Sequence, residues 1–351
     1  MIHVIIPHAK EENPRLEEVL AYALEGRDWE RIEDPKDLQK VMKEEAAPSL
    51  LFAVSLPRSG DAPAWRTFIA DCLTYPRTLE GAVGAVIVDG AGELFTKSLA
   101  RELIFAANYA GCAFPGKPLV EARGDLYNFN TAAKIRGVDN FEAYLEVARA
   151  LVTKLEQGIP AAAGEGRRNV LMIHASSRAT SNSLLLWEMV KKGLGDRAEV
   201  TEISIRDGAI VDCRGCGFET CRHFGEKGDC FYGGLVVEQV YPAILACDAL
   251  VLICPNYNDA VGASLTAMFN RLTALFYNND FSAKKIFALV VSGYSGGELL
   301  AEQVIGAMCL NKGFALPPHF AMLETANDPR SILERDGVED RAAAMAARLL
   351  R

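Results

Sequence analysis

Four segments from the first half of the chain recur in the same order in the second half. The first two are apolar strand patterns that end in His-Ala or at a turn proline. The third is a helix followed by Gly and a short strand, and the fourth is a final amphipathic helix. The matched pairs are residues 3–9 with 169–175, 47–57 with 247–257, 107–115 with 309–317, and 137–152 with 337–350. Because chance matches would not keep this order, the pattern predicts a tandem duplication of one fold.

The apolar runs indicate the class of that fold. Runs such as ALVLIC (249–254) and IFALVV (286–291) are continuous rather than alternating, which is typical of strands buried on both faces of a parallel sheet. Helical patterns separate the runs. Each copy is therefore predicted to be α/β, with a doubly wound five-stranded parallel sheet and helices on both faces. We expect a first domain over 1–157, a Gly- and Ala-rich linker over 158–168, and a second domain over 169–351.

Charge and hydropathy argue against two classes of protein. The formal net charge is −9, and no clustered Lys/Arg surface is evident, which argues against a nucleic-acid binder. No apolar run approaches the roughly 18 residues that suggest a membrane span, and the first residues lack the pattern of a secretory signal. We therefore expect a cytoplasmic protein, in which persistent structural disulfides are disfavoured.

The loops that follow the strands hold the candidate site, because ligands of open α/β sheets bind beyond the carboxyl ends of the strands. The loop HASSRATSNSLLL (174–186) opens a helix and is dense in hydroxyl, amide and guanidinium donors. Beside helix N-terminal N–H groups, such donors favour a phosphate site, although Ser and Asn are also ordinary helix caps. The candidate phosphate ligands are Ser176, Arg178, Ser181, Asn182 and Ser183. The matching loop of the first copy carries Glu11 and Glu12, which would repel a phosphate.

Two further loops of the second copy are expected at the same edge of the sheet. One leaves its strand through a turn with an amide and an aromatic ring, and its candidate residues are Pro255, Asn256, Tyr257 and Asn258. The other is glycine-rich, so its backbone can approach a ligand closely, and its candidate residues are Ser292, Gly293, Tyr294 and Gly296. Each of these loops taken alone is also compatible with an ordinary turn.

These loops carry a resemblance to a known family. Residues 168–351 resemble the NADPH-dependent FMN reductase and iron–sulfur flavoprotein group, which has a flavodoxin-like fold. ASSRATSNS resembles the family's first loop, G-S-x-R-x-x-[GS]-N-[ST], with Ala175 in place of the usual Gly. Pro255 and Tyr257 match the family's P-x-Y loop, GASLTAMFNR resembles the helix after it, and SGYSGGE matches the glycine-rich loop.

The resemblance implies two tandem flavodoxin-like domains, of which only the second binds FMN. It places the FMN phosphate on the first loop and the isoalloxazine between the second and third, with NAD(P)H as the electron donor. The first copy, which retains no flavin motif, would then be a non-binding partner in an internal pseudo-dimer, and further homo-oligomers are compatible with this arrangement.

Four of the nine cysteines lie in one insertion of the second copy, over about residues 208–235. Cys213, Cys216, Cys221 and Cys230 have the spacing C-x2-C-x4-C-x8-C. The alternatives are an iron–sulfur cluster, zinc with His223 as a substitute ligand, or free or redox-active thiols. The resemblance favours a cluster near the flavin, but the last two intervals are wider than in iron–sulfur flavoproteins. We expect the other five cysteines, Cys72, Cys112, Cys247, Cys254 and Cys309, to be small core residues.

The sequence thus predicts a flavin-dependent oxidoreductase that moves electrons from NAD(P)H or a reduced partner through FMN to an unidentified small-molecule or protein acceptor. The flavin carries the redox chemistry, so no catalytic acid or base is nominated, and His174 is expected to be structural. One alternative is an electron-transfer protein without a turnover substrate, which would oxidise NAD(P)H negligibly. Another is a colourless zinc-binding interaction module.

Overall fold

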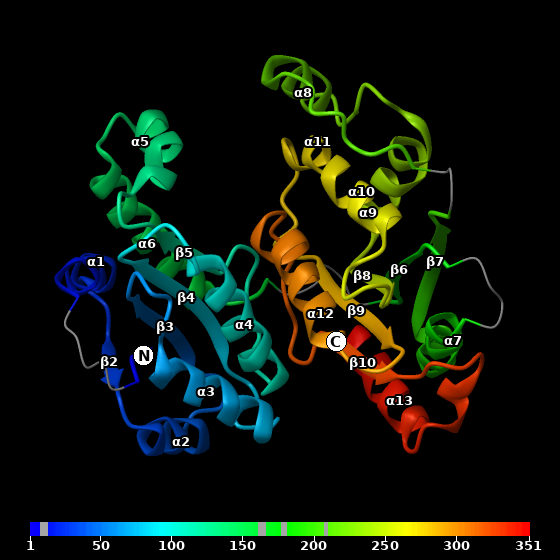
Figure 1. The fold of residues 1–351 in the computed structure, drawn as a ribbon, viewed down its shortest axis with the longest axis horizontal. Helices are drawn as coiled ribbons and strands as arrows, with labels where there is room; N and C mark the ends of the chain where they lie inside the picture. The colour runs from blue at the N-terminus through cyan, green and yellow to red at the C-terminus, as the bar shows by residue number, and fades with distance from the viewer. Residues whose placement is uncertain (8–12, 161–165, 177–180, 207–209) are drawn as a thin grey trace. The chain divides into compact units, whose positions relative to one another are not determined.

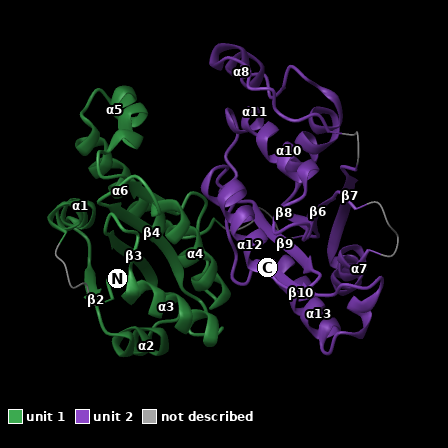
Figure 2. Ribbon diagram, viewed as in Figure 1, with its two compact units in different colours: residues 1–160 green, residues 161–351 purple. Residues whose placement is uncertain are grey.

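A computed structural model of the chain describes residues 1–7, 13–160, 166–176, 181–206 and 210–351 (Figure 1). The chain divides into two units, Met1–Pro160 and Ala161–Arg351 (Figure 2). Among the described residues, no helix combines the length and the apolar character needed to cross a bilayer.

The first unit is built on a five-stranded parallel sheet. Its strands are β1 (Ile2–Ile5), β2 (Trp29–Ile32), β3 (Ser49–Leu56), β4 (Val83–Gly90) and β5 (Leu119–Ala122). They pair in the order β2-β1-β3-β4-β5, and every pairing is parallel. Its helical segments are α1 (Pro14–Leu24), α2 (Pro35–Glu44), α3 (Pro63–Thr74), α4 (Thr96–Tyr109), the 3₁₀ turn η1 (Tyr127–Phe129), α5 (Asn130–Arg136) and α6 (Asn140–Gln157).

Local sequence explains where several of these helices begin. Helices α1, α2 and α3 each have a proline in the first turn, where the missing N–H costs no intrahelical bond. Asn13 and Asp34 cap α1 and α2 by accepting a hydrogen bond from a first-turn N–H. Helices α1 and α6 pack together on one face of the sheet, and α3 and α4 pack together elsewhere on the unit. The sheet is thus buried between helices.

The second unit has a second five-stranded parallel sheet. Its strands are β6 (Arg168–His174), β7 (Ala198–Ser204), β8 (Ala249–Pro255), β9 (Lys285–Ser292) and β10 (Ala321–Thr325). Its α-helices are α7 (Asn182–Leu194), α8 (Phe218–Gly225), α9 (Tyr241–Ala246), α10 (Ala263–Arg271), α11 (Thr273–Phe276), α12 (Gly297–Val304) and α13 (Val338–Leu349). The remaining helical segments are the 3₁₀ turns η2 (Gly195–Arg197) and η5 (Ser331–Glu334) and the π-helices η3 (Val236–Val240) and η4 (Ile305–Leu310).

Both sheets have the same strand order. The second runs β7-β6-β8-β9-β10, so in each unit the second strand lies outside the first, followed by the third, fourth and fifth. An isolated parallel bridge recurs too, joining Val83 to Ala113 in one unit and Lys285 to Ala315 in the other. This order is that of flavodoxin-like folds, and the predicted fold class is confirmed. Duplication of an ancestral unit stays a prediction.

The core of the second unit explains why its strands are apolar throughout. On one face, Val170, Val251 and Phe287 pack against Trp187 of α7 and Met345 of α13, all fully or almost fully buried. The alternate residues of the same strands, such as Leu171 and Leu252, are buried as well. Continuous burial of this kind requires cover on both faces of the sheet.

Candidate functional site

Three neighbouring strands of the second unit end at one edge of the sheet. Strand β8 lies between β6 and β9, and all three run parallel. In the register, His174 at the end of β6 pairs with Ile253, and Pro255 at the end of β8 pairs with Val291. The three predicted loops therefore leave the same edge of the sheet, where ligands of this fold class bind.

The first loop leads from β6 to the N-terminus of α7. Ser176 and Ser183 are buried, and Ser181 is the N-cap residue of α7. Arg178 lies outside the described residues. The side chain of Ser181 makes no capping hydrogen bond, and the first turn of α7 contains no acidic residue. The N–H groups at the start of this 13-residue helix therefore lack the oxygen acceptor that a serine usually provides there.

Asn182, the first residue of α7, forms hydrogen bonds with a distant part of the chain. Its Nδ2 donates to the carbonyl oxygens of Ala326 (3.1 Å) and Asp328 (2.9 Å), and its Oδ1 accepts from the N–H of Ile332 (3.3 Å). The amide thus ties the start of α7 to the segment that follows β10. Sequence reasoning assigned Asn182 to the phosphate and missed these partners, because they lie about 150 residues away along the chain.

The corresponding edge of the first unit has a different electrostatic character. Asn13 caps α1, and Glu17 lies in its first turn. Asp89, at 1% exposure, accepts from Nε (2.9 Å) and Nη2 (2.8 Å) of Arg15, and also from Nδ2 of Asn13 (3.0 Å). The hydroxyl of Tyr144 donates to the same carboxylate, and burial is the main cause that raises the pKa of this phenol. An internal ion pair occupies this edge, while Glu11 and Glu12 lie outside the described residues.

The second and third loops of the second unit are joined through Asn256. Its Nδ2 donates to Asp259 Oδ1 (3.2 Å), Ser292 Oγ (3.2 Å) and the carbonyl oxygen of Ser295 (2.9 Å). Its Oδ1 accepts from the N–H of Asp259 (2.9 Å). One side chain thus fixes the end of β8 to the end of β9, so the two loops form one structural element.

Backbone conformation shows why small or turn-forming residues occupy these loops. Gly296 has φ +81°, and a Cβ there would lie 2.3 Å from Asp259 Oδ1 and 3.2 Å from Asn256 Nδ2. Asn258 and Asp259 also have positive φ, which Asn and Asp tolerate better than most residues. Asp259 was missed by sequence reasoning, although its place after Asn258 in a turn is a usable signal.

Two aromatic side chains project from these loops. Tyr257 is 65% exposed and Tyr294 is 82% exposed. The Tyr294 hydroxyl accepts from Nδ2 of Asn327 (3.2 Å), which holds the ring against the segment after β10. Exposed rings on tethered loops offer flat apolar faces to a planar ligand. Asn327 was not predicted, and nothing local in the sequence marks it.

His174 lies beneath the first loop. It is half-buried, and its Nδ1 has no hydrogen-bond partner within the described part of the chain. Burial is the main cause that lowers its pKa, while the negative charge of Glu202 acts in the opposite direction. Glu202 itself accepts from Nε1 of Trp187 (2.8 Å) and pairs with Lys191 (2.8 Å). His174 therefore favours its neutral form, which agrees with a structural role.

The four clustered cysteines are free thiols on the insertion between β7 and β8. Cys213 is exposed, and Cys216, Cys221 and Cys230 are half-buried. No set of His, Cys, Asp or Glu side chains among the described residues, which include all four cysteines, is arranged to hold a metal ion. His223, the proposed substitute zinc ligand, has its Nε2 3.0 Å from Nζ of Lys227, so that nitrogen already has a hydrogen-bond partner.

The remaining cysteines are buried, as predicted: Cys72, Cys112, Cys247, Cys254 and Cys309. Burial raises the pKa of Cys254, at the end of β8, to about 12. Its thiol therefore stays protonated at neutral pH, and Cys254 is no candidate nucleophile.

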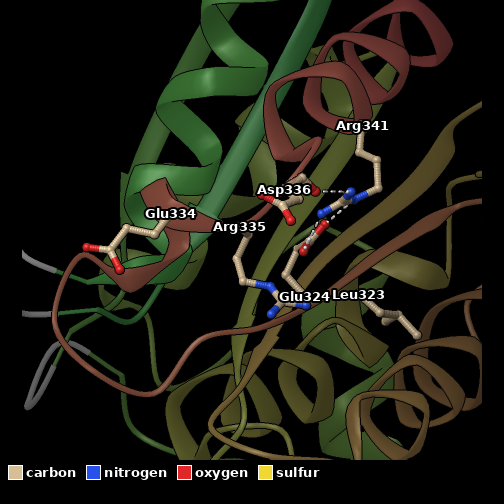
Figure 3. A pocket seen from close by; sticks show the side chains of 6 residues that line it. All are labelled: Leu323, Glu324, Glu334, Arg335, Asp336 and Arg341. Atoms are coloured by element: carbon tan, nitrogen blue, oxygen red, sulfur yellow. Dashed lines mark hydrogen bonds and ion pairs between the residues drawn. The ribbon is translucent and has the colours of Figure 1, made fainter.

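A separate polar cavity of about 330 Å³ lies where β10 meets the segment leading into α13 (Figure 3). It is lined by Leu323, Glu324, Glu334, Arg335, Asp336 and Arg341. The buried carboxylate of Glu324 accepts from Nε (2.6 Å) and Nη2 (2.8 Å) of Arg341. The cavity contains none of the predicted site residues.

Comparison with known proteins gives one family match. Residues 168–328 match the model of a family described as NADPH-dependent FMN reductase. No curated protein matches the chain.

Solved structures of similar fold align with about half of the chain. An FMN-dependent NADH-azoreductase from Bacillus anthracis, in complex with FMN, is 11% identical, covers 52% of this chain and 100% of its own, and has a TM-score of 0.37. An NAD(P)H:quinone oxidoreductase from Methanothermobacter marburgensis is 18% identical, covers 53% and 96%, and has a TM-score of 0.40.

Proposed function

We propose that the second unit binds one FMN at the carboxyl edge of its sheet, because residues 168–328 match the NADPH-dependent FMN reductase family model. The protein then moves electrons from NAD(P)H to an acceptor. The observation that carries the proposal is the N-terminus of α7, where the Ser181 hydroxyl makes no cap and no acid follows in the first turn. Such a helix end is suited to a phosphate.

The other residues of these loops support the proposal. Ser176, Ser181 and Ser183 would lie along the phosphate, with Arg178 as a further candidate from outside the described residues. Tyr257 and Tyr294 would face the isoalloxazine. The Asn256 hydrogen bonds hold the second and third loops in one arrangement, and the missing side chain of Gly296 lets the Asp259 carboxylate pack directly against the third loop. Loops fixed before the ligand arrives bind it at a lower entropic cost.

When bound, FMN supplies the electron transfer itself, accepting a hydride from a nicotinamide and passing electrons onward. The protein's part is to bind, orient and shield. Pro255 and the buried Ser292 start the two loops from the rigid ends of β8 and β9, and the exposed tyrosines present apolar surface to the ring and to an incoming substrate. No acid–base residue is required of the chain.

The test replaces Ser181 with Asp. Aspartate is as good an N-cap as serine, so the helix should remain stable, but a fixed negative charge at hydrogen-bonding range of a phosphate costs on the order of 4 kcal/mol at an effective dielectric constant of about 20. Allowing for solvent screening at this half-buried position, we expect the FMN dissociation constant to rise at least about tenfold.

The matched control is Ser181→Asn, a neutral cap of similar quality. Flavin fluorescence quenching on titration with the refolded apoprotein measures both dissociation constants, and circular dichroism checks the fold. If Ser181→Asp and Ser181→Asn bind FMN equally tightly, the phosphate does not lie at this helix end.

Turnover distinguishes the enzyme from an electron-transfer protein without its own substrate. The FMN-loaded protein should oxidise NADPH or NADH in the presence of a quinone, a nitro compound or a ferric chelate. Flavin binding without any such oxidation would favour the electron carrier. An iron–sulfur cluster or zinc on Cys213, Cys216, Cys221 and Cys230 stays a separate prediction, checked by metal analysis of anaerobically purified protein.

A further inference from the structure

The insertion that carries the four cysteines is anchored to α10 at both of its ends. Arg271, at 3% exposure, donates from Nη1 to the carbonyl oxygen of Val211 (3.4 Å) and from Nη2 to that of Gly233 (2.6 Å). Its neighbour Asn270 donates to Oδ1 of Asp212 (2.9 Å). The entry and the exit of the insertion are therefore held by the same buried side chain.

Cys213 and Cys216 both lie next to the anchored backbone. Cys213 directly follows Asp212, which is bonded to Asn270. The Sγ of Cys216 lies 3.9 Å from the hydroxyl of Tyr232, and Tyr232 directly precedes Gly233, which is bonded to Arg271. Cys213 is thus adjacent in sequence to one anchored residue, and Cys216 contacts the side chain of a residue adjacent to another.

The backbone between the two cysteines favours their approach. The segment is Cys213-Arg214-Gly215-Cys216, and Gly215 has φ +65°, a left-handed turn conformation that glycine adopts without strain. The guanidinium of Arg214 lies over the Tyr232 ring, 5.5 Å from its centroid. The turn is therefore packed against the same tyrosine that contacts Cys216.

The exposure of the two thiols differs in a way that suits thiol exchange. Cys213 is exposed and Cys216 is half-buried. A Cys-x-x-Cys pair with one accessible and one protected sulfur is the usual arrangement of a redox-active dithiol. Transient redox pairs are also the kind of disulfide that a reducing compartment permits.

We propose that Cys213 and Cys216 form a reversible disulfide by exchange with a small-molecule disulfide. The Cys213 sulfur attacks one sulfur of that disulfide, and one small thiol leaves. The Cys216 sulfur then attacks the Cys213 sulfur of the mixed disulfide, and the second small thiol leaves. Two electrons and two protons pass from the cysteine pair to the small molecule, which becomes two thiols. The reaction does not involve the flavin, so this proposal stands or falls separately from the proposed function.

The experiment equilibrates the full chain in buffers that contain oxidised and reduced glutathione at a series of ratios. Acid quenching, alkylation and mass spectrometry then count and locate the free thiols. We expect the oxidised sample to lose two hydrogens and two alkylation sites, both mapped to Cys213 and Cys216, and full recovery in excess reduced glutathione.

Serine variants test the assignment. Cys213→Ser and Cys216→Ser should abolish the intramolecular disulfide, whereas the matched variants Cys221→Ser and Cys230→Ser should keep it. Alkylation of all four cysteines of the insertion at every ratio of oxidised to reduced glutathione would overturn the proposal. So would a disulfide that involves Cys221 or Cys230, or protection of all four thiols by a metal ion detected in the same sample.

Discussion

Replacing Gly296 with Ala tests whether the third loop must keep its shape to bind FMN. Gly296 has φ +81°, and an alanine held there costs about 1–2 kcal/mol of backbone strain. The new Cβ would lie 2.3 Å from Asp259 Oδ1, so the exposed Asp259 carboxylate must move and give up its hydrogen bond with Asn256 (3.2 Å), at about 1 kcal/mol. The total is about 2–3 kcal/mol.

This free energy should be lost either from the stability of the apoprotein or from its affinity for FMN. If the free loop keeps its conformation, the variant loses stability. If the free loop relaxes, FMN binding has to restore the conformation, and the dissociation constant rises by up to about 30- to 150-fold. Urea denaturation of the apoprotein and fluorescence titration with FMN measure the two terms, whose sum should be about 2–3 kcal/mol.

Gly262→Ala is the matched control. Gly262 is also the N-cap of a helix, but its φ is −54° and nothing lies within 4 Å of an added Cβ. The alanine should cost at most about 1 kcal/mol, because alanine is a poorer N-cap than glycine. The reasoning is refuted if Gly296→Ala changes stability and FMN affinity no more than Gly262→Ala does.

Three further substitutions probe buried and half-buried polar groups. Burial lowers the folded-state pKa of His174 below its ordinary value of about 6.5, so as the pH falls the unfolded chain binds a proton before the folded chain does. The contribution of His174 to stability should therefore be complete above about pH 6.5 and decrease as the pH drops below that value. His174→Asn should flatten this pH dependence in denaturation curves recorded from about pH 7.5 to 5.5, and an unchanged slope would contradict the expectation. Arg341→Met leaves the Glu324 carboxylate buried without its partner and should lower the free energy of unfolding by about 2 kcal/mol, a value reduced for solvent screening because Arg341 is 45% exposed. Adding Glu324→Gln should recover part of that loss, and strictly additive effects would show that the pair is not coupled. In the first unit, His3 is fully buried, with Nδ1 2.8 Å from Glu30 Oε1 and Nε2 3.0 Å from Glu45 Oε1. His3→Gln should disturb these buried polar contacts and lose about 1–2 kcal/mol, whereas an unchanged urea midpoint would contradict it.

Much of the fold was predictable because local rules and tertiary packing agree. Continuous apolar runs such as 249–254 can be buried only in a sheet covered on both faces, and that is where β8 lies. The position of the candidate site followed from the same rule, since parallel strands end at one edge. The burial of Cys254 followed from its place in an apolar run.

Individual side-chain roles were harder to predict. Asn182 lies in a loop whose composition suggests phosphate, yet its amide is used to hold residues 326–332. Asn256 is predicted as a ligand residue, and the structure shows that its amide also links two loops. A polar side chain is equally suited to a ligand and to a backbone group, and only the folded chain decides which one lies within hydrogen-bonding distance.

The sequence by itself determined the α/β class, the edge of the sheet where a ligand would bind, and the clustering of four cysteines, because strand burial and spacing are properties of contiguous residues. Only the tertiary structure decided that one arginine, Arg271, holds both ends of the cysteine insertion, and that Asp89 and Arg15 pair at the corresponding edge of the first unit. Both facts depend on contacts between residues far apart in the sequence, and hydrogen-bond geometry at such a distance is set by packing rather than by local pattern.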